Sequence, residues 1–295
     1  MAAGEVSGSV FDREIISLNI QEEAEVFLRT EIAKASPSDR RRAFEKFVTA
    51  ALGSVPWIGG FLSAAANFKT EEGTLRTDTL HTQWLEEHAR KLGKLRATLE
   101  SVVDRFENLG EAIDDRIQSE EYLQLVRRAF RVWDDAATDE KRRYVGNVLA
   151  NAAGTRACSD DVVRLFLDWL NTYHESHFAV IRTIYAKRGI SRFEIWDQIY
   201  GELPREDSAE ADLYRLLIRD LSTGGVIRQD RETNHVGQFL RKRRPTARQS
   251  ASNTMESSFE DTKPYVLTGL GEQFVHYTMN EVVTRIGPGP AEPTA

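Results

Sequence analysis

Apolar residues recur at steps of three and four along most of the chain from Phe11 to about Leu170, and strand-like alternation is nearly absent there. This spacing gathers apolar side chains on one face of each successive α-helix, so we expect an α-helical domain over residues 11–172. The polar, glycine- and proline-rich residues 285–295 and the first ten residues are expected to be disordered. With 295 residues, the chain is long enough for about two domains with hydrophobic cores.

Composition excludes several classes of protein. Hydrophobic residues make up 41% of the chain and charged residues 29%, which is typical of neither a disordered tail nor an integral membrane bundle. The formal net charge of −7 argues against a general nucleic-acid coat protein. The single cysteine, Cys158, excludes an internal disulfide framework and a multi-cysteine zinc site. Residues 1–10 carry no secretory pattern, so we expect a cytoplasmic protein.

The stretch from Phe47 to Phe68 contains no charged residue. About 20 apolar residues would suffice for a membrane helix, but Pro56 and three glycines interrupt this stretch. They favour a buried helical hairpin of two short helices and a turn. A regulated membrane hairpin is an open alternative, because the three arginines at 40–42 that precede the stretch suit a lipid surface. As part of an ordinary helix start, these arginines would be unfavourable to the helix dipole. Its candidate lipid-contacting residues are Phe47, Leu52, Pro56, Trp57, Ile58, Phe61 and Leu62.

A long helix is expected from about Leu75. Its apolar residues alternate steps of three and four along a narrow seam suited to antiparallel or coiled-coil packing, and internal packing is the favoured use of that seam. Three further helices are expected to follow Ser119, Thr138 and Ser159, each of which is a suitable N-cap. The seam comprises Leu85, Leu92, Leu95, Leu99, Val102, Phe106, Leu109 and Ile113.

The pattern changes at about Tyr173, where shorter helices and strand candidates begin. Ser191 with Glu194 forms a capping box, and Asp207 with Glu210 marks another helix start. The expected elements are helices over 174–187, 191–200 and from 207 to Gly224, strands over 226–229 and 265–267, and a last helix that follows Gly271.

Two segments carry a resemblance to a known fold. Residues 217–227, Leu-Ile-Arg-Asp-Leu-Ser-Thr-Gly-Gly-Val-Ile, resemble the end of a recognition helix that turns into a wing. Residues 265–274, Tyr-Val-Leu-Thr-Gly-Leu-Gly-Glu-Gln-Phe, resemble the returning wing strand and the start of the final helix. The C-terminal part is therefore similar to a winged-helix domain, and the resemblance implies an α+β domain over residues 173–284 with a long wing insertion over 230–262. The expected fold is mainly α, a multi-helix domain with a hairpin and a long helix followed by this winged helix.

The sequence carries none of the common catalytic motifs. The sequence lacks a phosphate-binding loop, a dinucleotide fingerprint and a nucleophile elbow. Cys158 is expected to be an inert helix-end thiol. His174 and His177 are three residues apart, but no third ligand follows at a suitable spacing, so they are expected to be polar surface rather than a metal site. We predict no catalytic residue, metal or cofactor, and no small-molecule substrate is inferred.

The sequence leaves three non-enzymatic functions open, and protein recognition is the favoured one. An acidic third helix suits a basic or mixed protein surface, or a second copy of the chain, better than DNA, because Glu206 and Asp207 at its start, with acidic neighbours, would repel phosphates. The candidate partner-binding residues are Glu210, Asp212, Arg215 and Arg219. DNA binding through the wing is the first alternative, with the candidate contacts Arg192, Arg228, Arg241, Lys242, Arg243 and Arg244. Membrane action through the apolar hairpin, with the protein peripheral to a membrane, is the second.

Overall fold

The computed structural model describes residues 39–61, 63, 79–231, 234, 236, 238, 240 and 257–279. This part of the chain is mainly α-helical, with one small antiparallel sheet of two strands. It divides into two compact units, of which the second spans Thr172–Asn280. The helix expected over 12–35, the expected disordered ends and the basic run 241–244 lie outside the described residues.

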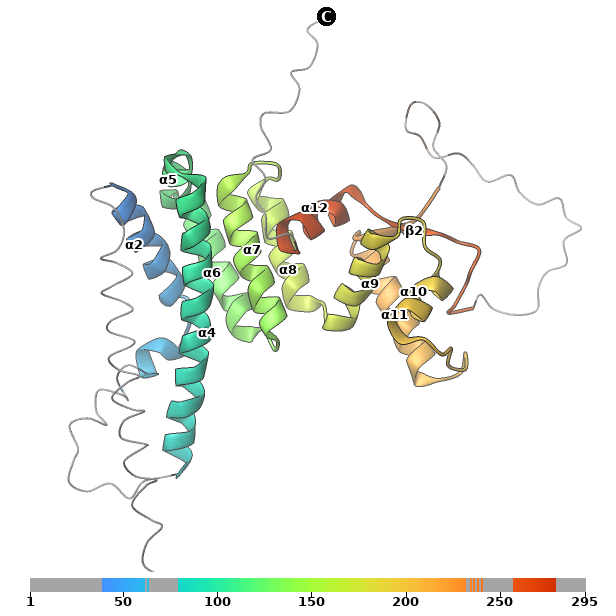
Figure 1. Cartoon of the computed structure of the whole chain (residues 1–295), viewed down its shortest axis with the longest axis horizontal. Coiled ribbons are helices and arrows are strands. Elements are labelled where there is room, and N and C mark those ends of the chain that lie inside the picture. The colour runs from blue at the N-terminus through green and yellow to red at the C-terminus, as the bar shows by residue number, and fades with distance from the viewer. Residues whose placement is uncertain are drawn as a thin grey trace, which may run out of the picture. The chain divides into compact units, whose positions relative to one another are not determined.

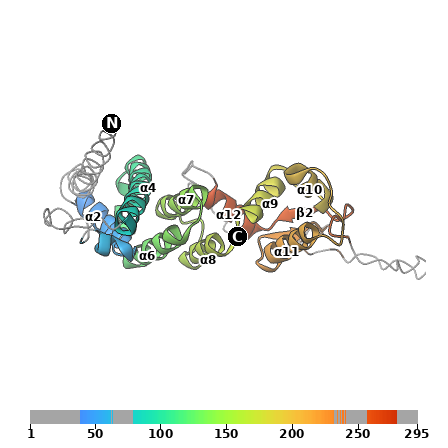
Figure 2. The ribbon, with the colours of Figure 1, turned by 90° about the horizontal axis from the view of Figure 1, so that it is seen from below.

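The first unit is a bundle of helices (Figures 1 and 2). Helix α4 packs against α7, α7 against α6, and α6 against α2, while α5 lies against α2 and α6. Residues 57–61 form a short helical turn after α2. The elements are α2 (Asp39–Leu52), α4 (Thr79–Leu109), the 3₁₀ turn η1 (Glu111–Ile113), α5 (Asp114–Gln118), α6 (Glu120–Asp135), α7 (Asp139–Gly154) and α8 (Asp160–Thr172).

Aromatic side chains fill the centre of the bundle. The ring of Phe47 on α2 lies 5.1 Å from that of Phe106 on α4 and 6.3 Å from that of Phe130 on α6. The seam of α4 is buried from Leu95 to Leu109, as internal packing requires. Helix α4 ends before Ile113, contrary to the expected extent of the seam, because Gly110 takes the left-handed region (φ 72°) and stops the helix.

The N-caps of this unit follow the sequence closely. The Ser119 hydroxyl accepts a hydrogen bond from the N–H of Tyr122, and the Thr138 hydroxyl accepts one from the N–H of Lys141. Each satisfies one of the free amides at a helix start, which is the reason why α6 and α7 begin where they do.

The second unit is built around α9, which packs against α10, α11, α12 and β2 (Figure 1). The two strands pair antiparallel, with Ile227 opposite Leu267, and an isolated bridge joins Ile190 to Tyr265 on the other side of β2. The elements are α9 (Glu175–Ala186), α10 (Arg192–Tyr200), α11 (Ala209–Thr223), β1 (Ile227–Gln229), β2 (Tyr265–Leu267) and α12 (Gly269–Thr278).

One local expectation needs correction. Helix α11 is capped by Ser208 rather than Asp207, whose carboxylate instead accepts two hydrogen bonds from Arg205, at 2.8 and 2.9 Å. Within the predicted insertion 230–262, residues 257–262 form turns and bends that pack on the unit, where Phe259 is buried (8% exposed).

Candidate interaction surface

Helix α11 has one face in the core of the second unit. The Ser208 hydroxyl accepts a hydrogen bond from the N–H of Ala211 at 3.2 Å and fixes the start of the helix, and Gly225 (φ 78°) follows its end. The buried face consists of Ala211, Tyr214, Leu217, Ile218 and Leu221.

The opposite face of α11 presents two leucines among charged residues. Leu213 is 52% exposed and Leu216 is 40% exposed, and their spacing of three places them side by side on the helix. Only one stripe of this helix is buried, so both leucines face solvent. We call the exposed set Glu210, Asp212, Leu213, Arg215, Leu216 and Arg219 the α11 surface.

The arginines of the α11 surface lie beside carboxylates. An Arg215 nitrogen is 2.9 Å from an Asp212 oxygen, and another is 3.6 Å from an oxygen of Glu206. The Arg219 Nε is 3.8 Å from an Asp220 oxygen. Such exposed pairs contribute little to stability, but they offset the positive charge that a phosphate backbone would need.

Arg192, a predicted nucleic-acid contact, is engaged inside the unit. Its guanidinium donates hydrogen bonds to the Tyr265 hydroxyl at 3.0 and 2.6 Å and lies over the Tyr265 ring, which ties α10 to β2. Its backbone carbonyl accepts a hydrogen bond from the Tyr214 hydroxyl at 2.7 Å. Burial raises the pKa of Tyr214, so this hydroxyl remains a donor from α11 to α10 at neutral pH.

Glu206 lies at the expected acidic start of the third helix, but the sequence did not predict that it and Phe259 anchor the chain that returns from the insertion. The carboxylate of Glu206 accepts hydrogen bonds from the Ser257 hydroxyl and from the N–H of Ser258, the latter at 3.0 Å. Burial alone would raise the pKa of Glu206, but these hydrogen bonds outweigh it and lower that pKa.

The Phe259 ring completes this anchor. Its centroid lies 5.2 Å from that of Trp196 and 5.7 Å from that of Tyr214, so α10, α11 and the chain that returns from the insertion share one aromatic cluster. The sequence offered one signal for this contact, because Phe259 is an isolated aromatic residue within a polar run. Periodicity could not show which side chains it packs against.

The remaining predicted nucleic-acid contacts are spread out. Arg228 is exposed on β1, and the four basic residues 241–244 lie outside the described part of the chain. The structure therefore brings no further predicted DNA contact to the α11 surface among the residues it describes.

The residues of the predicted membrane hairpin lie mostly within the first unit. Phe47, Ile58 and Phe61 are buried, and the Trp57 indole N–H donates to an Asp134 oxygen at 2.8 Å. Leu52 is half-buried, Pro56 is exposed, and Leu62 lies outside the described residues. Within the described ranges, no helix has the length and apolar character needed to cross a membrane.

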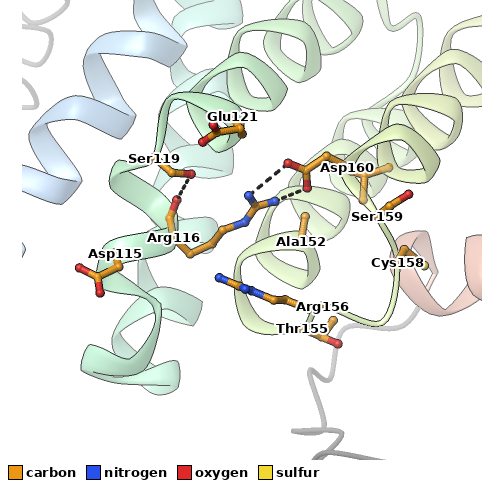
Figure 3. Close-up of a pocket in the computed structure, with 11 residues that line it drawn as sticks. Asp115, Arg116, Ser119, Glu121, Ala152, Thr155, Arg156, Cys158, Ser159 and Asp160 are labelled. Atoms are coloured by element: carbon orange, nitrogen blue, oxygen red, sulfur yellow. Dashed lines mark hydrogen bonds and ion pairs between the residues drawn. The ribbon is translucent and has the colours of Figure 1, made fainter.

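A hollow of about 530 Å³ in the first unit contains Cys158 and charged side chains (Figure 3). Arg116 points across it to Asp160, and the two form a bidentate ion pair, while Arg156 extends beside them. Because the charge of its central arginine is already paired with a carboxylate and its other charges are of both signs, the hollow defines no ligand chemistry.

The paired histidines act as a helix cap. The Nδ1 atom of His177 accepts a hydrogen bond from the N–H of His174 at 3.1 Å, at the start of α9. In the part of the chain that the structure describes, no group of three or more histidine, cysteine or carboxylate side chains is placed to hold a metal ion.

Comparisons with known proteins add no relative. No protein-family model matches the chain, and neither the curated proteins nor the solved structures contain a significant match.

Proposed function

We propose that this chain is a non-catalytic, cytoplasmic regulatory protein in which a C-terminal winged-helix module recognises a protein partner through the α11 surface. The winged-helix assignment is supported by the order of elements, α9, α10, α11, β1, β2 and α12, and by the bridge from Ile190 to Tyr265. That bridge adds a third extended segment to the two-stranded ribbon, between the first two helices of the module.

One observation carries the proposal. Every large hydrophobic side chain that is exposed in the described part of the chain belongs to the second unit. An exposed apolar patch with charged neighbours is typical of a recognition surface, and among these side chains Leu213 and Leu216 are adjacent on α11. The side chains are Tyr185, Tyr200, Leu203, Leu213, Leu216, Val236, Leu240 and Leu270.

The α11 surface favours protein over DNA. The two adjacent leucines supply apolar area that a phosphate backbone does not use, and Arg215 and Arg219 lie beside carboxylates. The first unit would then transmit the binding event or carry out the response to it.

Quantitative co-purification tests the proposal. The tagged full chain is compared with the double variant Glu210→Lys/Asp212→Lys, and Glu272→Lys on α12 serves as a control that makes half of that charge change at an exposed site. We expect a protein that co-purifies with the wild type and the control to be lost in the double variant. Equal recovery with all three forms would contradict recognition by the α11 surface.

A further inference from the structure

We infer that the partner of the α11 surface is a second copy of this chain, bound with the two α11 helices antiparallel. This inference rests on the proposed function, because it names the occupant of the same surface. Two features of the helix carry it: its leucines are self-complementary, and its charges are arranged so that a two-fold axis brings opposite signs together.

The leucines fix the centre of the contact. Leu213 and Leu216 are both exposed and lie one turn apart on the same face of α11. With a two-fold axis midway between them, Leu213 of each copy packs against Leu216 of the other, so four leucines form one apolar cluster. A two-fold contact is the arrangement that soluble homo-oligomers most often adopt.

The charges fix the direction of the partner helix. Asp212 and Arg219 are seven residues apart, which places them on the same side of α11, at opposite ends of the leucine pair. In the antiparallel pair, the position of Asp212 in one copy and that of Arg219 in the other lie about 3 Å apart along the helix axis, given a rise of about 1.5 Å per residue. A parallel pair would instead oppose Asp212 to Asp212 and Arg219 to Arg219, which is repulsive.

The contact also agrees with the ion pairs inside one copy. The Asp212 carboxylate already accepts from Arg215 at 2.9 Å, and its remaining lone pairs are free to accept from the Arg219 guanidinium of the other copy. Since only one helix face per copy takes part, we expect the contact to bury less than the about 1,200–2,000 Å² of stable interfaces and to have a dissociation constant of roughly micromolar size.

Sedimentation equilibrium of the purified full chain tests the association. We expect a monomer–dimer equilibrium, and Leu213→Asp or Leu216→Asp should weaken it by at least about tenfold, because each places a charge in the apolar centre. Tyr185→Asp, at an exposed tyrosine of α9, is the matched control and should leave the equilibrium unchanged. A monomer at all concentrations, or a dimer that the leucine variants leave intact, would overturn the inference.

Charge reversal and cysteine cross-linking test the direction. Asp212→Arg and Arg219→Asp should each weaken the dimer. The double reversal should restore it, because the ion pair between the copies forms again with its charges exchanged. In that variant, residue 212 and Arg215 of the same copy carry like charges. In a Cys158→Ser background, a mixture of Asp212→Cys and Arg219→Cys chains should form the mixed disulfide. Two copies of residue 219 should not cross-link, because they lie about 13 Å apart along the axis.

The mixed disulfide supports the antiparallel pair, and a 219–219 disulfide refutes it. A chain that stays monomeric, yet still loses a co-purifying protein of another sequence in the Glu210→Lys/Asp212→Lys variant, would overturn this inference and leave the proposed function standing. A dimer that persists in both leucine variants would form through another surface, so it would overturn this inference and leave the proposed function to the co-purification test.

Discussion

At the scale of single residues, Gly271 shows a constraint that no motif search reveals. A Cβ atom at this position would lie 2.2 Å from the carbonyl oxygen of Val226, so only glycine lets the start of α12 approach the residue before β1 this closely. The Thr268 hydroxyl accepts from the N–H of Gly271 at 2.9 Å and donates to the carbonyl of Gly225 at 2.6 Å, which fixes the same junction. The second glycine of Gly269-Leu270-Gly271 therefore serves the close packing of backbone at this junction.

Gly271→Ala is expected to destabilise the second unit by about 1–3 kcal/mol, because the obstructing atom belongs to the backbone and cannot rotate away. Gly269→Ala, two residues earlier in the same helix, meets nothing within 4 Å and should leave stability almost unchanged. Urea unfolding followed by circular dichroism compares the two. Equal midpoints for both variants would show that the junction is looser than the structure has it.

Glu206 gives a prediction about pH. Its lowered pKa means that folding favours the ionised carboxylate, so its contribution is present above the unfolded pKa near 4.5 and is lost as pH falls through the lower folded value. Glu206→Gln should therefore reduce stability at pH 7 and make the loss below pH 4.5 less steep. Unfolding free energies measured from pH 3 to 7, with the exposed Glu202→Gln as control, provide the check. If the unfolding free energies of wild type and Glu206→Gln changed with pH in parallel, the lowered pKa of Glu206 would be contradicted.

At the scale of elements, the sequence predicted most of the helices because their ends carry local chemical signals. The capping box of Ser191 and Glu194 is formed, with Ser191 accepting from the N–H of Glu194 at 3.2 Å and Glu194 accepting from that of Ser191 at 3.0 Å. The strands at 227–229 and 265–267 pair with each other as two isolated apolar runs suggested. The anchoring of Phe259 was not predictable, since contacts between residues about 60 positions apart, such as Phe259 with Trp196, leave no periodic trace.

Phe259→Ala should destabilise the second unit by about 3 kcal/mol, because it leaves a cavity between α10 and α11. Leu270→Ala removes a side chain that is 39% exposed and should cost less than about 0.5 kcal/mol. Hydrogen exchange of the full chain provides the measurement, with faster exchange in α10 and α11 expected only for Phe259→Ala. Unchanged protection in both helices would show that the aromatic cluster does not hold the unit together.

At the scale of the whole molecule, the chain is mainly helical, as the sequence predicted, and its internal contacts divide it into two units between Asn171 and Thr172. The candidate surface was predictable only in part. Helical spacing located α11 and its charged residues, but which leucines of α11 face outward depends on the packing of α9 and β1 against it, which the sequence of α11 alone does not encode.

The proposal predicts that DNA affinity does not depend on α11. Arg215→Ala and Arg219→Ala should leave binding of the full chain to a short duplex unchanged within about twofold, because both arginines lie beside carboxylates. Fluorescence anisotropy over a range of salt concentrations measures this. A loss of affinity, together with a slope of log affinity against log salt concentration that is smaller by about 0.9 per arginine, would instead identify the two arginines as phosphate contacts.

Site-specific photo-cross-linking in cells tests the central claim most directly. A photoreactive residue is placed at Leu213 on the α11 surface, and in a separate chain at Tyr185, which is similarly exposed (53%) on α9. The account predicts a protein adduct from position 213 that disappears when Leu216→Asp is added, and no such adduct from position 185. Adducts to nucleic acid at 213, or protein adducts that are the same at both positions and unaffected by Leu216→Asp, would contradict it.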